Sequence, residues 1–183
     1  MFAISESAKT VNYFELFNLP FQFEVKLAGV SDTYRELQRV VHPDKFANAG
    51  EHEQLIAVQK SAQVNDAFQT LKNPLLRAQY MLAEQGVDLQ IEQKTLQDPT
   101  FLMQQMELRE QLEDIAALDE PDDEIVAMEQ EIKQITSQLY QQLIPLLVSG
   151  CKIELENAAN IVRKLKFTNK LREELDRLEE SLQ

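Results

Sequence analysis

Apolar residues recur at helical spacing in two stretches of the first half of the chain, on either side of a short polar segment. The recurring positions are Val30, Tyr34, Leu37 and Val41 before it, and Leu55, Val58, Ala62, Phe68 and Leu71 after it. This spacing predicts two amphipathic helices, over about 27–41 and 51–71, that pack antiparallel. The segment between them contains His42-Pro43-Asp44. Because the residue before a proline is disfavoured in the α region, the sequence predicts an exposed bend at these three residues.

Short polar residues followed by proline mark further helix starts. Asn73-Pro74 and Asp98-Pro99 each supply an N-cap and a proline at the first helical position. Pro121 opens another helix with acidic residues in its first turn. Pro145 is expected to kink or end that helix, although the chain can return to helix before Gly150. The predicted helices lie near 12–17, 27–41, 51–71, 74–86, 99–118, 121–145 and 154–182. No strand pattern or internal repeat is evident, so the predicted fold class is all-α.

The helices fall into two predicted domains with different charge. A helical hairpin with short flanking helices is expected over 1–84, a connector over 85–98, and a three-helix bundle over 99–183. Residues 1–80 carry eight Lys/Arg and nine Asp/Glu, whereas residues 81–183 carry ten and twenty-two. This asymmetry suggests different partners for the two parts. Because a chain this acidic repels the phosphate groups of nucleic acids, we do not expect nucleic acid as a partner.

Composition favours a globular protein of the cytoplasm. Apolar residues make up 44% and charged residues 27% of the chain. The aliphatic run around Pro145 is too short to span a bilayer, and Met1–Ser5 has no basic leader, so neither membrane insertion nor a secretory signal is expected. A single cysteine, Cys151, suits a reducing compartment. Together with His42 and His52 it shows no zinc-motif spacing, so no metal site is predicted.

A small group of cations adjoins the bend. Arg35 and Arg39 share one face of the second helix, and Lys45 follows the proline. Alone, these would be ordinary solvated charges, but beside a rigid exposed bend they favour a docking surface for an acidic partner. His42 and Asp44 could also serve as a general base and an orienting acid. No nucleophile motif and no glycine-rich phosphate loop accompanies them, so we expect neither an enzyme nor a cofactor.

Four segments, in this order and at these spacings, resemble a J domain. They are Asn12-Tyr13-Phe14-Glu15-Leu16-Phe17, His42-Pro43-Asp44-Lys45-Phe46, Val64-Asn65-Asp66-Ala67-Phe68 and Arg77-Ala78-Gln79-Tyr80. J domains stimulate ATP hydrolysis by DnaK-type chaperones. The resemblance implies that His42, Pro43 and Asp44 contact the ATPase domain of such a chaperone. It also implies that the basic second helix, with Arg35 and Arg39, and the adjoining Lys45 dock electrostatically.

The fifth predicted helix has apolar residues on two sides. At about 100° per residue, Phe101, Leu108, Leu112 and Ile115 form one core stripe. Leu102, Met106 and Met103 lie about 100°, 140° and 200° from Phe101, near Glu110 and Glu107. They either meet a neighbouring helix or form an exposed patch for a partner, and periodicity alone leaves both readings open. Exposed methionines are typical of adaptable recognition surfaces.

A second resemblance bears on this choice. The segments 101–110 and Val162-Arg163-Lys164-Leu165-Lys166-Phe167 resemble the C-terminal domain of the HscB family, J-domain co-chaperones of iron–sulfur cluster assembly. In that family this domain binds the scaffold protein IscU. The resemblance implies that Leu102, Met103, Met106 and Phe167 supply apolar contacts and that Glu107 and Glu110 supply polar ones. Met106 stands where the family often has leucine, a residue of similar volume. Periodicity does not establish that Phe167 is exposed.

The expected function is therefore that of a co-chaperone, not an enzyme. It stimulates the ATPase of an HscA-type chaperone of the DnaK family and delivers an IscU-type scaffold to it. By resemblance, ATP belongs to the chaperone and the iron–sulfur cluster to the scaffold. One alternative is a general J-protein that delivers unfolded clients, although the Gly/Phe-rich linker or zinc-binding cysteine pairs usual in such proteins do not occur here. The other alternative is a structural helical protein without a chaperone partner.

Overall fold

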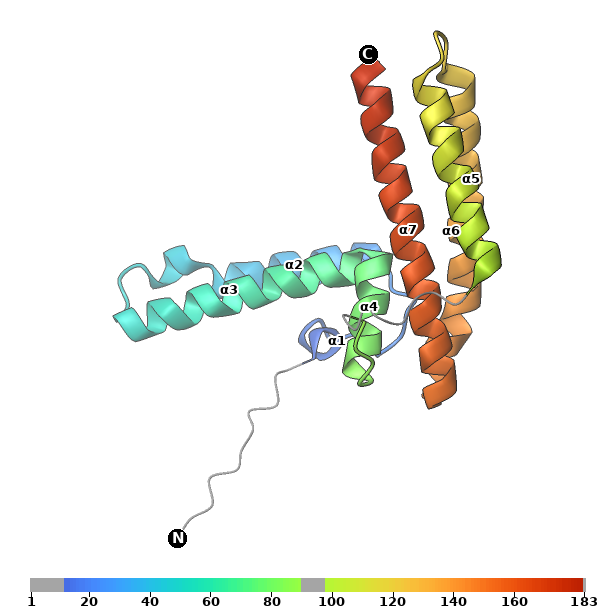
Figure 1. Ribbon diagram of the computed structural model, residues 1–183. Coiled ribbons are helices and arrows are strands. Elements are labelled where there is room, and N and C mark those ends of the chain that lie inside the picture. The colour runs from blue at the N-terminus through green and yellow to red at the C-terminus, as the bar shows by residue number, and fades with distance from the viewer. Residues whose placement is uncertain (1–11, 90–97, 183) are drawn as a thin grey trace. The chain divides into compact units, whose positions relative to one another are not determined.

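The fold is all-α throughout the described ranges. The computed structural model describes residues 12–89 and 98–182, and it divides into two compact units that separate between Tyr80 and Met81 (Figure 1). The elements are α1 (Tyr13–Leu16), α2 (Leu27–Val41), the 3-10 turn η1 (Pro43–Phe46), α3 (Glu51–Lys72), α4 (Pro74–Glu84), α5 (Pro99–Ala116), α6 (Asp122–Ser149) and α7 (Lys152–Leu182). Most of the predicted connector, 90–97, and the predicted absence of a leader at Met1–Ser5 lie outside the described residues.

The helix starts expected from sequence are confirmed where a side chain caps the helix. The Oδ1 atom of Asn73 accepts hydrogen bonds from the backbone N–H groups of Leu75 and Leu76, at 2.9 and 3.1 Å. Asp98 caps α5 in the same way through the N–H of Phe101, at 3.0 Å. These bonds satisfy donors that have no partner inside the helix. Helix α2, in contrast, begins after Lys26 without a side-chain cap.

In the N-terminal unit, α2 and α3 form an antiparallel hairpin with η1 at its free end (Figure 1). Val30 of α2 and Val64 of α3 are buried in the hairpin. The rings of Tyr34 and Phe68 stack with centroids 4.1 Å apart. The Tyr34 hydroxyl donates to Asn65 Oδ1 at 2.8 Å, so aromatic and polar contacts together fix the register of the two helices.

The segment Arg77–Tyr80 ties α4 to the rest of this unit. Arg77 is buried, donates from Nη1 to the carbonyl oxygen of Leu71 at 2.7 Å, and lies 4.9 Å from the centroid of the Phe23 ring. Tyr80 stacks on Tyr13 with centroids 4.4 Å apart, and its hydroxyl accepts from the Tyr13 N–H at 2.9 Å. This motif is thus explained by packing and hydrogen bonding inside the unit.

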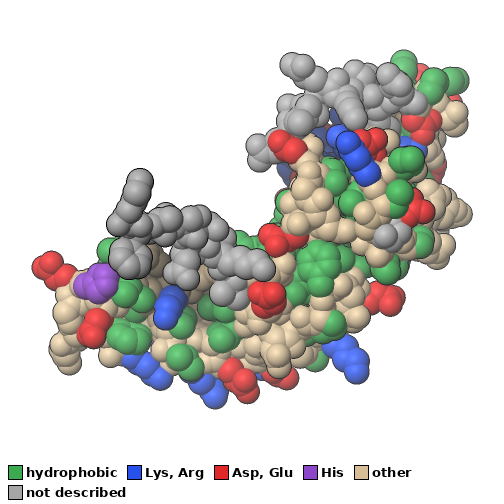
Figure 2. Space-filling view, turned by 90° about the horizontal axis from the view of Figure 1, so that it is seen from below, with side chains coloured by type: hydrophobic (Ala, Val, Ile, Leu, Met, Phe, Trp, Pro, Cys, Tyr) green, Lys and Arg blue, Asp and Glu red, His purple; other side chains and the backbone are tan. Residues whose placement is uncertain are grey.

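The apolar face predicted for the first half of α3 is wrong. Leu55 and Val58 are exposed, and Ala62 is exposed too. The buried positions in this region of the helix are instead Ala57 and Val64. The helix carries two apolar stripes, and the buried one is made of Ala57, Val64, Ala67 and Leu71. Figure 2 shows one face of the molecule, on which hydrophobic side chains lie among charged ones.

In the C-terminal unit, α5, α6 and α7 form a bundle (Figure 1). Its core cluster is made of aliphatic side chains from all three helices, with half-buried residues around it. The buried members are Leu108, Ile115, Ile125, Met128, Ile132, Leu171 and Leu175, and the half-buried ones are Leu112, Ile135, Phe167 and Leu178. Burial of each large side chain contributes on the order of 1.5–3 kcal/mol. Within the described ranges, no helix combines the length and apolarity needed to cross a bilayer.

Of the two outcomes expected at Pro145, a kink or an end of the helix, the end does not occur, because α6 continues through the proline to Ser149. Leu143 and Leu147, on either side of the proline, are 0% and 2% exposed. A proline inside a helix costs about 3 kcal/mol, and the burial of two leucines offsets that cost. The helix ends instead at Gly150, whose φ of 64° places it in the left-handed region that favours glycine.

Candidate functional site

The predicted bend is an exposed 3-10 turn that the backbone holds in shape. His42 Nδ1 accepts a hydrogen bond from the N–H of Asp44 at 3.3 Å, and Pro43 is the first residue of η1. The N–H of Lys45 donates to the carbonyl oxygen of His42 at 3.1 Å. The side chains of His42 and Asp44 are 51% and 90% exposed. Because Nδ1 accepts, the neutral imidazole carries its proton on Nε2, which is then available as a donor to a partner.

The turn is fastened to α3 by a residue that sequence reasoning did not single out. Gln54, in the first turn of α3, donates from Nε2 to the carbonyl oxygens of Ala47 and Ala49, at 3.2 and 3.0 Å. These two bonds connect the segment after η1 to the helix that follows it. No local sequence signal identifies this role, since glutamine is common on helix surfaces and its acceptors are backbone atoms.

The predicted cations are exposed, but one of them has an intramolecular partner. Arg35 lies 3.1 Å from Asp32 Oδ1 within α2, and both side chains are 70% exposed. An exposed pair of this kind contributes little, so its guanidinium can exchange partners readily. Arg39 and Lys45 are exposed as well. The structure thus places Arg35 and Arg39 on the helix that leads into the turn, and Lys45 inside the turn.

On α5, the three residues expected to face away from the core do so. Leu102, Met103 and Met106 are 41%, 63% and 72% exposed, and they are named here the apolar patch. Glu107 and Glu110 are exposed beside it. Phe101, by contrast, is buried, as the helical spacing predicted. Exposure of this kind on a helix that already buries another face is typical of a protein–protein contact surface.

Phe167 of α7 is half-buried at the seam between α5 and α7. Its ring meets that of Phe101 edge-to-face, with centroids 5.8 Å apart and planes at 85°. The guanidinium of Arg109 lies 5.8 Å from the centroid of the Phe167 ring. Sequence reasoning missed Arg109, although its position three residues after Met106 places it on the same side of α5. The structure thus brings Phe167 beside α5 and only partly exposes it.

An ion pair joins α5 and α7 at the N-terminal end of α5. Lys164 Nζ lies 2.5 Å from Asp98 Oδ2 and 5.0 Å from the centroid of the Phe101 ring. The hydrogen bond from Lys164, and after it that from the N–H of Phe101, lowers the pKa of the Asp98 carboxyl below its ordinary value of 3.8. The N-cap of α5 is therefore also its link to α7.

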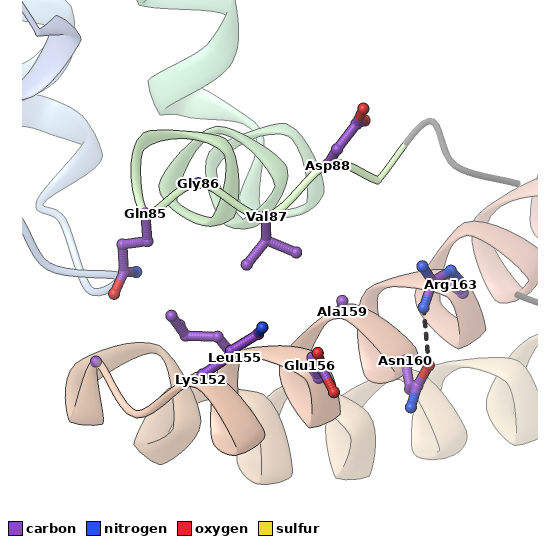
Figure 3. Close-up of a pocket in the computed structure, with 11 residues that line it drawn as sticks. Gln85, Gly86, Val87, Asp88, Lys152, Leu155, Glu156, Ala159, Asn160 and Arg163 are labelled. Carbon is purple, nitrogen blue, oxygen red and sulfur yellow. Dashed lines mark hydrogen bonds between the residues drawn. The ribbon is translucent and has the colours of Figure 1, made fainter.

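One cavity in the C-terminal unit contains none of the predicted site residues. It is an open groove of about 490 Å³ between the turn at 85–88 and the N-terminal half of α7. Figure 3 shows Val87 pointing across it toward Leu155 and Ala159, with Lys152 near one end and Arg163 near the other. Among the residues that the structure describes, no three His, Cys, Asp or Glu side chains form a group suited to a metal ion.

Comparison with known proteins identifies the family. Residues 97–176 match the family model described as "HSCB C-terminal oligomerisation domain". A co-chaperone protein HscB homolog from Photobacterium profundum is 56% identical over 171 residues, which cover 93% of this chain and 98% of the homolog. The chain belongs to the HscB family of co-chaperones. A second HscB homolog, from Shewanella halifaxensis, is 51% identical over 94% of this chain and 99% of its own length.

Solved HscB structures share the fold of both units. The chaperone HscB from Vibrio cholerae superposes with a TM-score of 0.83 at 45% identity, covering 94% of this chain and 99% of the other. Human co-chaperone HscB gives a TM-score of 0.82 at 26% identity, covering 93% and 82%. In HscB terms, the N-terminal unit with the hairpin is the J domain, and the bundle of α5, α6 and α7 is the helical C-terminal domain. The all-α, two-part fold expected from sequence is confirmed.

Proposed function

We propose that this protein stimulates the ATPase of an HscA-type chaperone of the DnaK family through its J domain. We also propose that it presents an IscU-type iron–sulfur scaffold protein to that chaperone through its C-terminal domain. ATP is the chaperone's substrate and the cluster is the scaffold's cargo, so this chain performs no covalent chemistry. Such activity belongs in the cytoplasm, where these partners would be found and where the single Cys151 stays reduced.

The observation that carries the proposal is the pair of exposed surfaces on different units. The turn at His42–Asp44 is exposed but conformationally restricted by Pro43, by the hydrogen bond to Nδ1 and by the Gln54 bonds. A restricted loop loses less entropy on docking than a free one. Asp44 can accept charge-assisted hydrogen bonds from an arginine of the chaperone, and Arg35, Arg39 and Lys45 attract an acidic surface.

The C-terminal domain offers the second surface. The apolar patch, the accessible part of Phe167, and the carboxylates of Glu107 and Glu110 together supply apolar and polar contacts. Joining the two surfaces in one chain raises the effective concentration of the scaffold near the chaperone, which increases the rate of transfer without any additional contact. The proposed division of labour places chaperone contact within 1–84 and scaffold contact within 99–183.

Reconstitution with purified proteins tests this function. The ATPase rate of an HscA-type chaperone is measured alone, with this protein, with an IscU-type scaffold, and with both. We expect the combination to stimulate more than the sum of the separate additions, because each surface binds its own partner. If a chemically unfolded protein replaces the scaffold with equal effect, the chain is a general J-protein instead. If no stimulation occurs in any mixture, the chaperone assignment is wrong.

A further inference from the structure

The segment 163–172 of α7 concentrates positive charge in an otherwise acidic domain. It holds five of the ten Lys/Arg residues of 81–183, namely Arg163, Lys164, Lys166, Lys170 and Arg172. No Asp or Glu occurs between Glu156 and Glu173, although residues 81–183 contain twenty-two of them. Like charges on neighbouring helical turns repel each other, so this run lowers the stability of the isolated helix.

Three of these cations lie on one side of Phe167. At about 100° per residue, Arg163, Lys170 and Lys166 are about 40°, 60° and 100° around α7 from Phe167. The buried residue Leu171 lies on the other side, toward the core. Lys166 and Lys170 are exposed, and Arg163 is half-buried. These three residues, Arg163, Lys166 and Lys170, are named the basic stripe.

Within the described part of the chain, the basic stripe has only weak or uncharged partners. Arg163 Nη1 donates to Asn160 Oδ1 at 2.7 Å, an acceptor without charge (Figure 3). Lys170 Nζ lies 3.9 Å from Glu174 Oε1, an exposed pair within one helix that contributes little. Lys164 differs, because it is committed to Asp98 at the seam. The charges of the stripe are therefore available to a partner.

Arg109 continues the positive region across the seam to α5. It is exposed, and its guanidinium lies over the Phe167 ring. Around α5 it is followed by Leu102 and Met106, and then, in this order, by Glu110, Met103 and Glu107. The surface thus carries cations on α7 and at Arg109, then Phe167 and the apolar patch, with one carboxylate (Glu110) within the patch and one (Glu107) at its far edge. Because positive and negative groups are unevenly distributed over this surface, a partner with complementary charges would bind it in one orientation.

We propose that the basic stripe and Arg109 bind an acidic patch on the scaffold protein and thereby fix the orientation in which it docks. This inference rests on the proposed function, since it concerns the partner of the same surface. The basic stripe spans eight residues of helix, from 163 to 170, and its ends are about 10 Å apart along the axis. That is close to one Debye length at physiological salt, so only groups directly facing it feel its charge. The chain's net charge of −13 opposes a long polyanion, which favours a compact acidic patch on a folded protein.

The test compares two double variants with the same change of charge. Lys166→Gln with Lys170→Gln removes two charges of the stripe, whereas Lys133→Gln with Lys152→Gln removes two from exposed positions outside it. Binding of a purified IscU-type scaffold is measured at low and high ionic strength. We expect the stripe variant to bind about 3- to 10-fold more weakly at low salt, mainly through slower association, and the control to match the wild type. At high salt the difference should disappear.

Each outcome decides a separate point. If the wild-type protein binds the scaffold and both variants bind equally well, the inference is overturned while the proposed function stands. If the wild-type protein does not bind the scaffold, the proposed function fails first. Anionic vesicles are measured in parallel. A stripe variant that loses vesicle binding but keeps scaffold binding would show that the stripe serves a membrane surface, which also overturns the inference.

Discussion

His42 and Asp44 are joined within the turn, because His42 Nδ1 accepts a hydrogen bond from the Asp44 N–H at 3.3 Å. This bond leaves the imidazole Nε2 to a partner and fixes the direction of the ring. We expect His42→Gln to reduce stimulation of an HscA-type ATPase at least 10-fold, since glutamine cannot keep both the local acceptor and the outward donor in this geometry. Scaffold affinity should remain unchanged. The measurement is steady-state ATP turnover, with a scaffold titration alongside.

His52→Gln is the matched control for this variant. His52 is the only other histidine and is exposed in the first turn of α3, so its substitution changes the same chemistry at a different position. Both variants should melt within a few degrees of the wild type. Full stimulation by the His42 variant would remove the J-domain assignment of the turn.

The different exposure of residues on α5 and α7 predicts different effects of their substitution on scaffold binding and on stability. Leu102→Ala and Met106→Ala should each weaken scaffold binding while changing the free energy of unfolding by less than about 0.5 kcal/mol, because both side chains are exposed and neither belongs to the core cluster. Phe167→Ala should weaken binding and also cost about 2 kcal/mol, because the ring packs on the core cluster and on Phe101. Scaffold titration and urea unfolding measure the two effects.

An exposed apolar residue outside the apolar patch tests whether truncation of any exposed apolar side chain would weaken scaffold binding. Ile153 of α7 is 70% exposed and lies outside the apolar patch, so Ile153→Ala should leave scaffold affinity unchanged. A large loss of stability in Leu102→Ala would instead mean that this side chain is part of the core.

The ion pair between Asp98 and Lys164 predicts a pH-dependent stability. The pKa of Asp98 is lowered in the folded protein, chiefly by the Lys164 hydrogen bond. The stabilisation of the fold by the ionised Asp98 carboxylate is therefore fully present at pH values above its ordinary pKa of 3.8. It is lost as the pH falls through the lowered pKa of the folded protein. Asp98→Asn keeps a good N-cap but removes the charge. The variant should be less stable than the wild type at pH 7, with a difference that shrinks below pH 3.8.

Urea unfolding at a series of pH values measures this difference. Asp119→Asn removes one negative charge from the exposed segment between α5 and α6, and it should show no comparable trend. A constant gap between Asp98→Asn and the wild type across the whole pH range would contradict the role of the charge.

Pro145 predicts a stabilising substitution. The proline cannot donate to the carbonyl four residues earlier, and α6 continues past it nonetheless. Pro145→Ala should restore that hydrogen bond and raise the free energy of unfolding by about 1–3 kcal/mol. Pro99→Ala is the comparison, because Pro99 is the first residue of α5, where proline costs nothing, and no gain is expected there. Equal effects of the two substitutions would argue against this account.

Sequence reasoning worked best where one local signal dominates. The starts of α4 and α5 follow from Asn73-Pro74 and Asp98-Pro99, because cap and proline act within one turn. It did not decide between a kink and an end at Pro145, where burial of leucines on both sides outweighs the local cost and the helix continues. It failed for Leu55 and Val58, because two apolar stripes on one helix satisfy the same periodicity and only tertiary packing selects between them.

For the candidate surfaces, too, local signals could be predicted from sequence and contacts between distant segments could not. Helical spacing alone showed that Leu102, Met103 and Met106 lie off the core stripe but left open whether a neighbouring helix covers them, and the family resemblance favoured exposure. The half-burial of Phe167 was not predictable, because it depends on where α5 lies against α7. Arg109 could have been found from its spacing to Met106, but its stacking on Phe167 is a contact between segments far apart in the chain. Gln54 gave no signal at all.

The two-residue link between α6 and α7 bears on how the bundle assembles. Gly150 and Cys151 alone separate helices of 28 and 31 residues, so these two can meet with little loss of loop-closure entropy. Helix α5 is also joined to α6 by a short link, 117–121, but it buries far fewer residues than α6 or α7, and its contacts with α7 require a much larger loop to close. We therefore expect the α6–α7 pair to form first during folding and α5 to join it afterwards. Newly made or partly denatured chains would then lack a scaffold-binding surface until α5 has docked, so scaffold binding would report on completed folding.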